Sequence, residues 1–216
     1  MQTELAREQM IEQQIRAWDV LDARVLDVLR QVPRERFVPE KQSFLAFADA
    51  EVPLAHGQHM LRPSVAGRLL QALALTGSER VFAVGAGSGY ITACLAAAGL
   101  AVRAVEIFPD LAELAKRNVH ALQFDNVQII SADACELREN NLYDAIALTA
   151  SLPVYDERWE KLLEVGGRLF VVVGKPPIME ARLVRRIAAD TWSTESLFET
   201  LIDPLRNARR PEEFRF

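Results

Sequence analysis

A glycine-rich turn in the middle of the chain is the segment whose residue types are best suited to chemistry. An apolar run over residues 80–84 is followed by Gly85-Ala86-Gly87-Ser88-Gly89 and then by a helical pattern over 91–98. Glycines let a chain turn sharply off a strand and bring its backbone close to a ligand, and the next helix offers free N–H groups. The turn therefore predicts a binding site at Gly85, Ala86, Gly87 and Gly89.

Two details separate this turn from other nucleotide-binding loops. Tyr90 stands where a dinucleotide fingerprint needs its third small residue, and a bulky ring there disfavours an NAD-dependent oxidoreductase. The lysine and Ser/Thr of a nucleoside-triphosphate loop are also missing from the run. On the loop alone, a tight strand–helix turn without a ligand remains the alternative.

Acidic residues follow the next two apolar runs. Glu106 ends the run 101–105, and Asp133 comes shortly after the run 127–130. A carboxylate at the first position can accept hydrogen bonds from both ribose hydroxyls of an adenosine, while Asp133 could reach the adenine amino group. A solvated strand end and a helix cap are the alternative roles. Loop, Glu106 and Asp133 together form the layout of an S-adenosylmethionine site, with Ile107 and Ala134 beside the two acids.

Short apolar runs that alternate with helical patterns must position these residues. They predict an α/β fold with a doubly wound, mostly parallel sheet covered on both faces. The predicted strands are 80–84, 101–105, 127–130, 145–148 and 169–173, and the predicted helices are 64–75, 91–98, 109–122 and the end of one at 159–163. Gly166-Gly167 is interpreted as a turn.

The two ends of the chain differ from this central part. Residues 3–32 form helical patterns, with Asp19 and Asp22 as cap candidates, and 49–63 is an irregular loop. Residues 182–188 and 195–202 flank Asp190-Thr191 as an antiparallel hairpin. We expect a single domain over 1–216, with an N-terminal helical cap and substrate loop (1–76) and a cofactor-binding core (77–216). The charged tail after Pro204 is expected to run over the surface; it contains Arg209, Arg210, Glu212 and Glu213.

Composition narrows the class of protein. The 216 residues are 50% hydrophobic, enough for a core without staples, and the two cysteines fit a reducing, cytoplasmic compartment. A net charge of −5 argues against nucleic acid or an acidic membrane as a partner. The three histidines are scattered, so no metal site is expected, and no apolar run is long enough for a membrane span. The sequence leaves the oligomeric state open.

Motifs outside the glycine turn carry a family resemblance from about residue 10 to 174. The chain resembles the protein-L-isoaspartate O-methyltransferases, which are class I S-adenosylmethionine-dependent methyltransferases. The matching motifs are Met10-Ile11-Glu12-Gln13-Gln14-Ile15, Val32-Pro33-Arg34, Phe37-Val38-Pro39, His56-Gly57-Gln58, Gly85-Ala86-Gly87-Ser88-Gly89-Tyr90, Tyr143-Asp144-Ala145-Ile146, Thr149-Ala150 and Gly166-Gly167-Arg168-Leu169.

The resemblance implies methyl transfer from S-adenosylmethionine to the α-carboxylate of an isoaspartyl residue, in a cleft covered by the N-terminal helical cap. The ester then collapses to a succinimide, and repeated rounds restore aspartate. It also implies that Gly85, Ala86 and Gly87 approach the methionine part of the cofactor, Glu106 the ribose and Asp133 the adenine.

The chain departs from the family pattern at two positions. The family has Thr-Ile-Ser after His-Gly-Gln, with the serine as its catalytic hydroxyl, but Leu61 occupies the serine position here and His59 the threonine position. Ser64 lies three residues further on, so the role is not transferred to it. His59 or Arg62 could hold a substrate carboxylate by charge-assisted hydrogen bonds instead. Ala83 replaces a glutamate that supports the loop in the family, which predicts weaker cofactor binding.

Leu61 keeps three functions open. The first is an isoaspartyl methyltransferase, and the second is a divergent methyltransferase that acts on another carboxylate or a small molecule. The third is a module that binds S-adenosylmethionine without catalysis. Leu61 favours the last two, whereas His56-Gly57-Gln58 favours the first.

Overall fold

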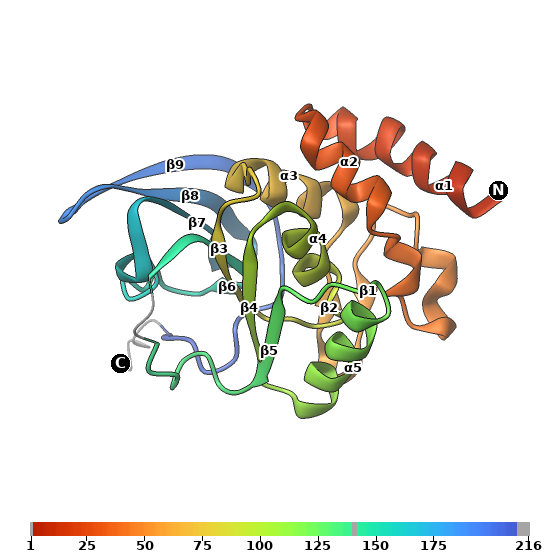
Figure 1. Cartoon of the computed structure of the whole chain (residues 1–216). Helices are drawn as coiled ribbons and strands as arrows, with labels where there is room; N and C mark the ends of the chain where they lie inside the picture. The colour runs from red at the N-terminus through yellow and green to blue at the C-terminus, as the bar shows by residue number, and fades with distance from the viewer. Residues whose placement is uncertain (1, 140–141, 211–216) are drawn as a thin grey trace.

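A seven-stranded sheet forms the centre of the molecule. The structure is a computed structural model that describes residues 2–139 and 142–210. The order across the sheet is β5-β4-β3-β6-β7-β8-β9 (Figure 1). The strands are β3 (Arg80–Val84), β4 (Ala101–Glu106), β5 (Val127–Ser131), β6 (Tyr143–Leu152), β7 (Leu163–Lys175), β8 (Ile178–Ala188) and β9 (Thr191–Glu199).

The pairing confirms the mostly parallel sheet. Strands β5, β4, β3, β6 and β7 are parallel neighbours, and only β8 and β9 join antiparallel. The chain order reverses between β3 and β6, because β4 and β5 lie on one side of β3 and all later strands lie on the other. Ligands of such sheets bind beyond the carboxyl ends of the strands at this reversal.

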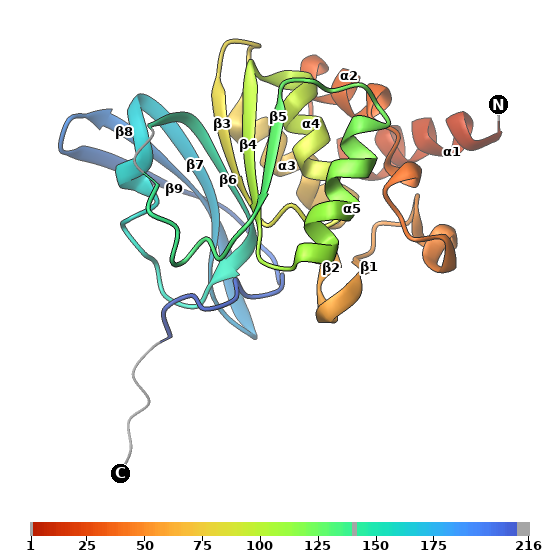
Figure 2. The ribbon, with the colours of Figure 1, turned by 60° about the horizontal axis from the view of Figure 1, so that its bottom comes forward.

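The α-helices gather on one face of the sheet, as Figure 2 shows. They are α1 (Gln2–Met10), α2 (Ala23–Gln31), α3 (Pro63–Leu73), α4 (Tyr90–Ala98) and α5 (Pro109–His120). Helix α4 is buried from Tyr90 to Ala96, as expected for a helix that is apolar on all sides. On the other face a second hydrophobic cluster around Phe82, Ile146 and Trp159 is covered by loops and the short 3₁₀ helix Glu160–Leu162.

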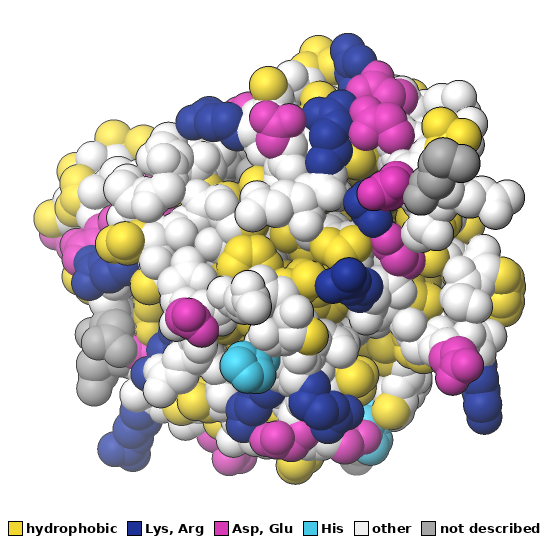
Figure 3. Space-filling model, turned by 45° about the vertical axis from the view of Figure 1, so that its right-hand side comes forward, with side chains coloured by type: hydrophobic (Ala, Val, Ile, Leu, Met, Phe, Trp, Pro, Cys, Tyr) yellow, Lys and Arg dark blue, Asp and Glu magenta, His cyan; other side chains and the backbone are white. Residues whose placement is uncertain are grey.

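The predicted loop 49–63 carries a small sheet of its own. Strand β1 (Val52–Pro53) pairs antiparallel with β2 (His59–Met60). One hydrophobic cluster contains residues of the N-terminal helices, of this small sheet and of the strands beyond the boundary predicted at 76, among them Leu29, Val52 and Val81. Figure 3 shows acidic and basic side chains interspersed over this face of the molecule.

Local predictions fail at two places. Asp22 caps α2 by accepting the N–H of Arg24, but Asp19 instead ends the preceding 3₁₀ turn with φ of +59°. Gly166-Gly167 is not a turn, because β7 runs straight through it. Between the paired residues Tyr143–Leu163 and Ala145–Arg168, β6 advances by two residues and β7 by five. The two glycines therefore lie in an irregular stretch of the ladder.

The C-terminal hairpin is confirmed, with Ala189-Asp190 between β8 and β9. The tail is only partly as predicted. Arg209 and Arg210 are exposed, and Glu212 and Glu213 lie outside the described residues, but the stretch just after Pro204 folds back onto the sheet. Among the described residues no helix is long and apolar enough to cross a membrane.

Candidate functional site

A pocket opens at the carboxyl ends of β3, β4, β5 and β6, where the strand order reverses. Its hollow measures about 890 Å³ when the space at its open mouth is included. Segments far apart in the chain line it: the loop 51–61, the glycine turn, the residues after β4 and β5, the end of β6, and 202–206. Within the described residues, the lining begins at Glu51, so the helices α1 and α2 do not reach the pocket.

The glycine turn forms the floor of the pocket through Gly85, Ala86 and Gly87. Gly85 has φ of +89°, and a Cβ built there would lie 2.5 Å from the hydroxyl oxygen of Thr149, so only glycine fits. The Thr149 hydroxyl donates to the carbonyl oxygen of Gly85 at 2.6 Å. The end of β6 therefore fixes the shape of the turn that follows β3.

Glu106 holds the same turn from the side. The residue is 5% exposed, and its carboxylate accepts the backbone N–H of Gly87 at 2.8 Å and that of Phe108 at 3.1 Å. A carboxylate offers about four acceptor positions, so it can still accept hydrogen bonds from a ligand in the pocket, which it lines. Ala83, where the family has its supporting glutamate, is buried in β3.

Asp133 lies across the pocket from the turn, together with Ala134. One of its carboxylate oxygens accepts the N–H of Cys135 at 2.7 Å and so shapes a turn; no helix begins there, so the helix-cap alternative is wrong. The other accepts the side-chain amide of Asn207 at 2.6 Å. Asp133 therefore both shapes its own turn and contacts the C-terminal part of the chain.

Two residues predicted for the site do not line the pocket. Gly89 begins α4 with φ of +89°, and a Cβ there would lie 3.0 Å from the backbone of Ala115, so this glycine lets α5 approach. Arg62 precedes α3 outside the lining. The other predicted residues, Gly85, Ala86, Gly87, Glu106, Ile107, Asp133, Ala134 and His59, all line it.

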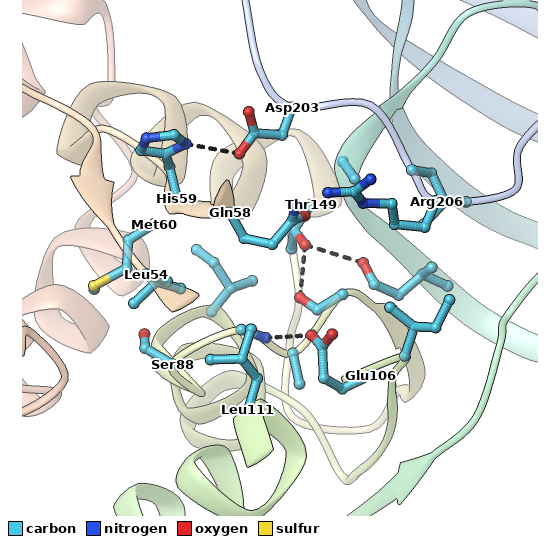
Figure 4. A pocket seen from close by; sticks show the side chains of 18 of the residues that line it. Leu54, Gln58, His59, Met60, Ser88, Glu106, Leu111, Thr149, Asp203 and Arg206 are labelled. Carbon is cyan, nitrogen blue, oxygen red and sulfur yellow. Dashed lines mark hydrogen bonds and ion pairs between the residues drawn. The ribbon is translucent and has the colours of Figure 1, made fainter. Parts of the chain in front are cut away.

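The part of the pocket lined by β2 and its neighbours combines apolar and ionisable side chains (Figure 4). Leu54, Met60 and Leu111 lie on one side, near Ser88. His59 lies above Met60 in this view, and its Nδ1 is 2.9 Å from a carboxylate oxygen of Asp203. Leu61 also lines this end and is 6% exposed.

Glu51 adds a second carboxyl group beside His59. Burial and the negative charge of Asp203 raise the pKa of Glu51, against the opposing charges of His59 and Arg62. Ser64 supplies no hydroxyl here, since it is fully buried, does not line the pocket, and donates its hydroxyl to Asp49 at 2.9 Å. The end that contains Leu61 therefore has a histidine and two carboxyl groups, but no serine at the family position.

Arg34 supports this end from inside the protein. Its guanidinium is fully buried, stacks over the ring of Tyr90 at 5.1 Å and donates to the carbonyl oxygen of Leu61 at 2.8 Å. Burial lowers the pKa of Arg34 below its usual range. Because Tyr90 follows the glycine turn, one side chain connects the loop at Leu61 to the start of α4.

Sequence reasoning missed several lining residues. Thr149 was recognisable, since Thr149-Ala150 is one of the motifs shared with the family. Glu51, Asp203 and Arg206 carried no local signal, because they reach the pocket only through the fold. In the ranges 2–139 and 142–210, no group of three or more His, Cys, Asp or Glu residues could hold a metal ion.

Comparisons with known proteins identify a family for the whole chain. A family model described as protein-L-isoaspartate(D-aspartate) O-methyltransferase matches residues 5–208. The chain is 39% identical over 202 residues to protein-L-isoaspartate O-methyltransferase 1 of Rhodopseudomonas palustris (strain HaA2), covering 92% of this chain and 82% of that protein. It is 35% identical over 207 residues to protein-L-isoaspartate O-methyltransferase 2 of Pelobacter propionicus, covering 95% and 92%.

The fold is also found in solved structures. One is a crystal structure described as a protein-L-isoaspartate O-methyltransferase from Plasmodium falciparum in complex with S-adenosyl-L-homocysteine. It aligns with a TM-score of 0.77 at 22% identity and covers 94% of this chain and 97% of that chain.

Proposed function

Because the chain belongs to the protein-L-isoaspartate(D-aspartate) O-methyltransferase family, we propose that it transfers a methyl group from S-adenosylmethionine to the α-carboxylate of isoaspartyl residues in proteins. The observation that carries the proposal is the pocket at the strand reversal, whose floor is the Gly85–Gly87 turn and whose wall is the buried carboxylate of Glu106. Membership of the family supports the reaction, and the shape and lining of the pocket support its assignment to the strand reversal.

The residues present fit S-adenosylmethionine. Gly85, Ala86 and Gly87 would lie against its methionine part, since a glycine-rich turn with small side chains lets the backbone approach a ligand. Glu106 would accept the ribose hydroxyls with the acceptor positions that Gly87 and Phe108 leave open. Ile107 and Ala134 would flank the adenine, and Asp133 would accept its amino group.

The acceptor needs positioning more than activation. S-adenosylmethionine supplies a methyl group on a positively charged sulfur, which an oxygen nucleophile can attack. A carboxylate is already ionised near neutral pH, so the task of the chain is to orient it and to exclude water. His59 is the predicted residue best placed to hold that carboxylate, since it lines the pocket and Asp203 fixes its ring. Arg62, predicted for the same task, would act only from outside the lining.

A second candidate function rests on Leu61. An apolar side chain at the family's serine position cannot donate a hydrogen bond, and Leu54, Met60 and Leu111 extend the apolar surface around it. This surface favours a different methyl acceptor, a less polar carboxylate or small molecule, within the same cofactor chemistry.

Labelled methyl transfer separates these functions. The parent protein is incubated with methyl-labelled S-adenosylmethionine and an isoaspartyl peptide, beside the same peptide with normal aspartate. Transfer to the isoaspartyl peptide alone supports the proposal. Binding of S-adenosylhomocysteine without transfer to either peptide favours another acceptor or a non-catalytic role, and absence of binding rules out all three.

A further inference from the structure

The segment 202–208, here called the C-terminal strap, crosses the pocket after the hairpin. It lies alongside the end of β6, where the N–H of Ser151 donates to the carbonyl of Asp203 and the N–H of Leu205 donates to the carbonyl of Ser151, both at 2.8 Å. Ile202, Asp203, Leu205 and Arg206 all line the pocket. The strap is therefore one wall of the site, built from residues that follow every strand of the sheet.

One end of the strap is tied to the residues after β5. The side-chain amide of Asn207 donates to Asp133 at 2.6 Å, and the thiol of Cys135 donates to the carbonyl of Arg206 at 3.4 Å. Asn207 has φ of +59°, a conformation that asparagine tolerates better than most residues. The backbone here is turned so that the amide of Asn207 meets Asp133.

Arg206 reaches across the mouth to the opposite wall. Its guanidinium donates to the carbonyl oxygen of His56 at 3.2 Å and lies 5.8 Å from the centre of the Phe108 ring. The His56 ring stacks on Phe108 at 4.1 Å and contacts the carboxylate of Asp110 at 2.8 Å. Arg206 is the one arginine or lysine among the described residues that line the pocket, and Figure 4 shows it on the same side as Asp203.

We propose that Arg206 and Asn207 are the residues that retain the cofactor, because they close the strap over its adenosine end. The inference rests on the proposed function, which assigns the adenosine to Glu106 and Asp133. With Asn207 on Asp133 and Arg206 on His56, the strap spans the pocket from one wall to the other. Both side chains are exposed, so these contacts can break and re-form as the ligand exchanges.

The test measures how fast S-adenosylhomocysteine leaves the protein. Arg206→Met keeps an unbranched side chain but ends before the guanidinium nitrogens and has no charge, and Asn207→Asp keeps the shape and the backbone preference but replaces the donor with a second carboxylate beside Asp133. Each is expected to raise the dissociation rate about tenfold, as the loss of one hydrogen bond allows, with an unchanged unfolding midpoint. Arg209→Met, exposed and outside the lining, is the matched control and should behave as the parent.

A second ligand locates the effect within the cofactor. Methylthioadenosine keeps the adenosine and lacks the amino acid part, so both variants should raise its dissociation rate by the same factor. An effect of Arg206→Met confined to S-adenosylhomocysteine would move Arg206 to the amino acid carboxylate and overturn the proposal. Unchanged dissociation in both variants would overturn it as well. A parent protein that binds neither ligand would instead overturn the cofactor assignment, and this inference with it.

Discussion

Arg34 donates a hydrogen bond of 2.8 Å to the carbonyl oxygen of Leu61, the residue at the family's serine position. The backbone there is therefore held from the core of the protein and not by the side chain that faces the pocket. A change of side chain at position 61 leaves this bond in place. The loop should present whatever side chain stands there in the same direction.

Leu61→Ser should restore the missing hydroxyl in the right place. We expect kcat/KM for isoaspartyl methylation to rise by about 10-fold to 10²-fold. This gain is at or below the usual cost of losing one well-placed hydrogen-bond donor, because an ionised acceptor depends on such a donor less. The measurement is labelled methyl transfer to an isoaspartyl peptide.

Leu61→Ala is the control, since it removes the same bulk without adding a donor. A gain in both variants would show that leucine only blocks the acceptor. Strong activity in the parent protein would contradict the assigned importance of the hydroxyl and leave positioning to His59.

Glu106 should both contact the ribose of the cofactor and hold the glycine turn in place. Glu106→Ala removes the predicted ribose contacts and the acceptor of the Gly87 N–H, so the affinity for S-adenosylhomocysteine should fall by about 1.5–3 kcal/mol or more. Glu106→Gln keeps one carbonyl oxygen and should fall between the parent and Glu106→Ala. Calorimetry measures both, with the exposed Glu113→Gln as the matched control. Parent-like affinity in Glu106→Ala would remove Glu106 from the site.

Glu79 should make the fold sensitive to acid. Burial alone would raise its pKa, but hydrogen bonds from Thr76 and Arg168 lower it to about 2, from 4.5. A carboxyl group with a lower pKa in the folded protein stabilises the fold above its unfolded pKa and loses that stabilisation as the pH falls.

The parent should therefore lose about 3 kcal/mol of unfolding free energy between pH 5 and pH 2 that Glu79→Gln does not lose. Denaturant unfolding at a series of pH values measures the difference. Glu195→Gln, on the exposed strand β9, should follow the parent. Parallel pH curves for the parent and Glu79→Gln would contradict the assignment.

Gly89 should act through packing and not through the ligand. Gly89→Ala places a side chain on a left-handed backbone, which should cost about 1–2 kcal/mol of unfolding free energy. The new Cβ would also lie 3.0 Å from Ala115, and this overpacking should cost about 1–3 kcal/mol more. Gly166→Ala is a close control, because φ is +87° there and a Cβ meets nothing within 4 Å. Thermal unfolding compares the two, and equal losses would show that backbone strain alone explains Gly89.

The central part of the site was predictable because its signals are local. A strand, a glycine turn and a helix follow one another over residues 80–98, and Glu106 ends the next strand, so sequence order gives their spatial order. The strap was not predictable in this way. Asp203 meets His59 across 144 residues of chain, and that contact exists only after the sheet has brought the two segments together.

Misread residues show the limits of residue type as a signal. Gly166-Gly167 has the composition of a turn, yet the long pairing of β6 with β7 carries the glycines through as an irregular strand. Gly89 has the position of a ligand-binding glycine, yet a neighbouring helix determines its role. In both cases tertiary contacts outweigh the local preference.

A protein is made from its N-terminus, so the order of synthesis bears on a pocket walled by residues 202–208. While those residues are still inside the ribosome, strands β3 to β7 can already have emerged with the glycine turn, Glu106 and Asp133. Such a nascent chain lacks one side of the hollow, and Asp133 and His56 lack their contacts with Asn207 and Arg206. Competence to hold a ligand would then arise only after residues 202–208 have left the ribosome and met the walls formed earlier.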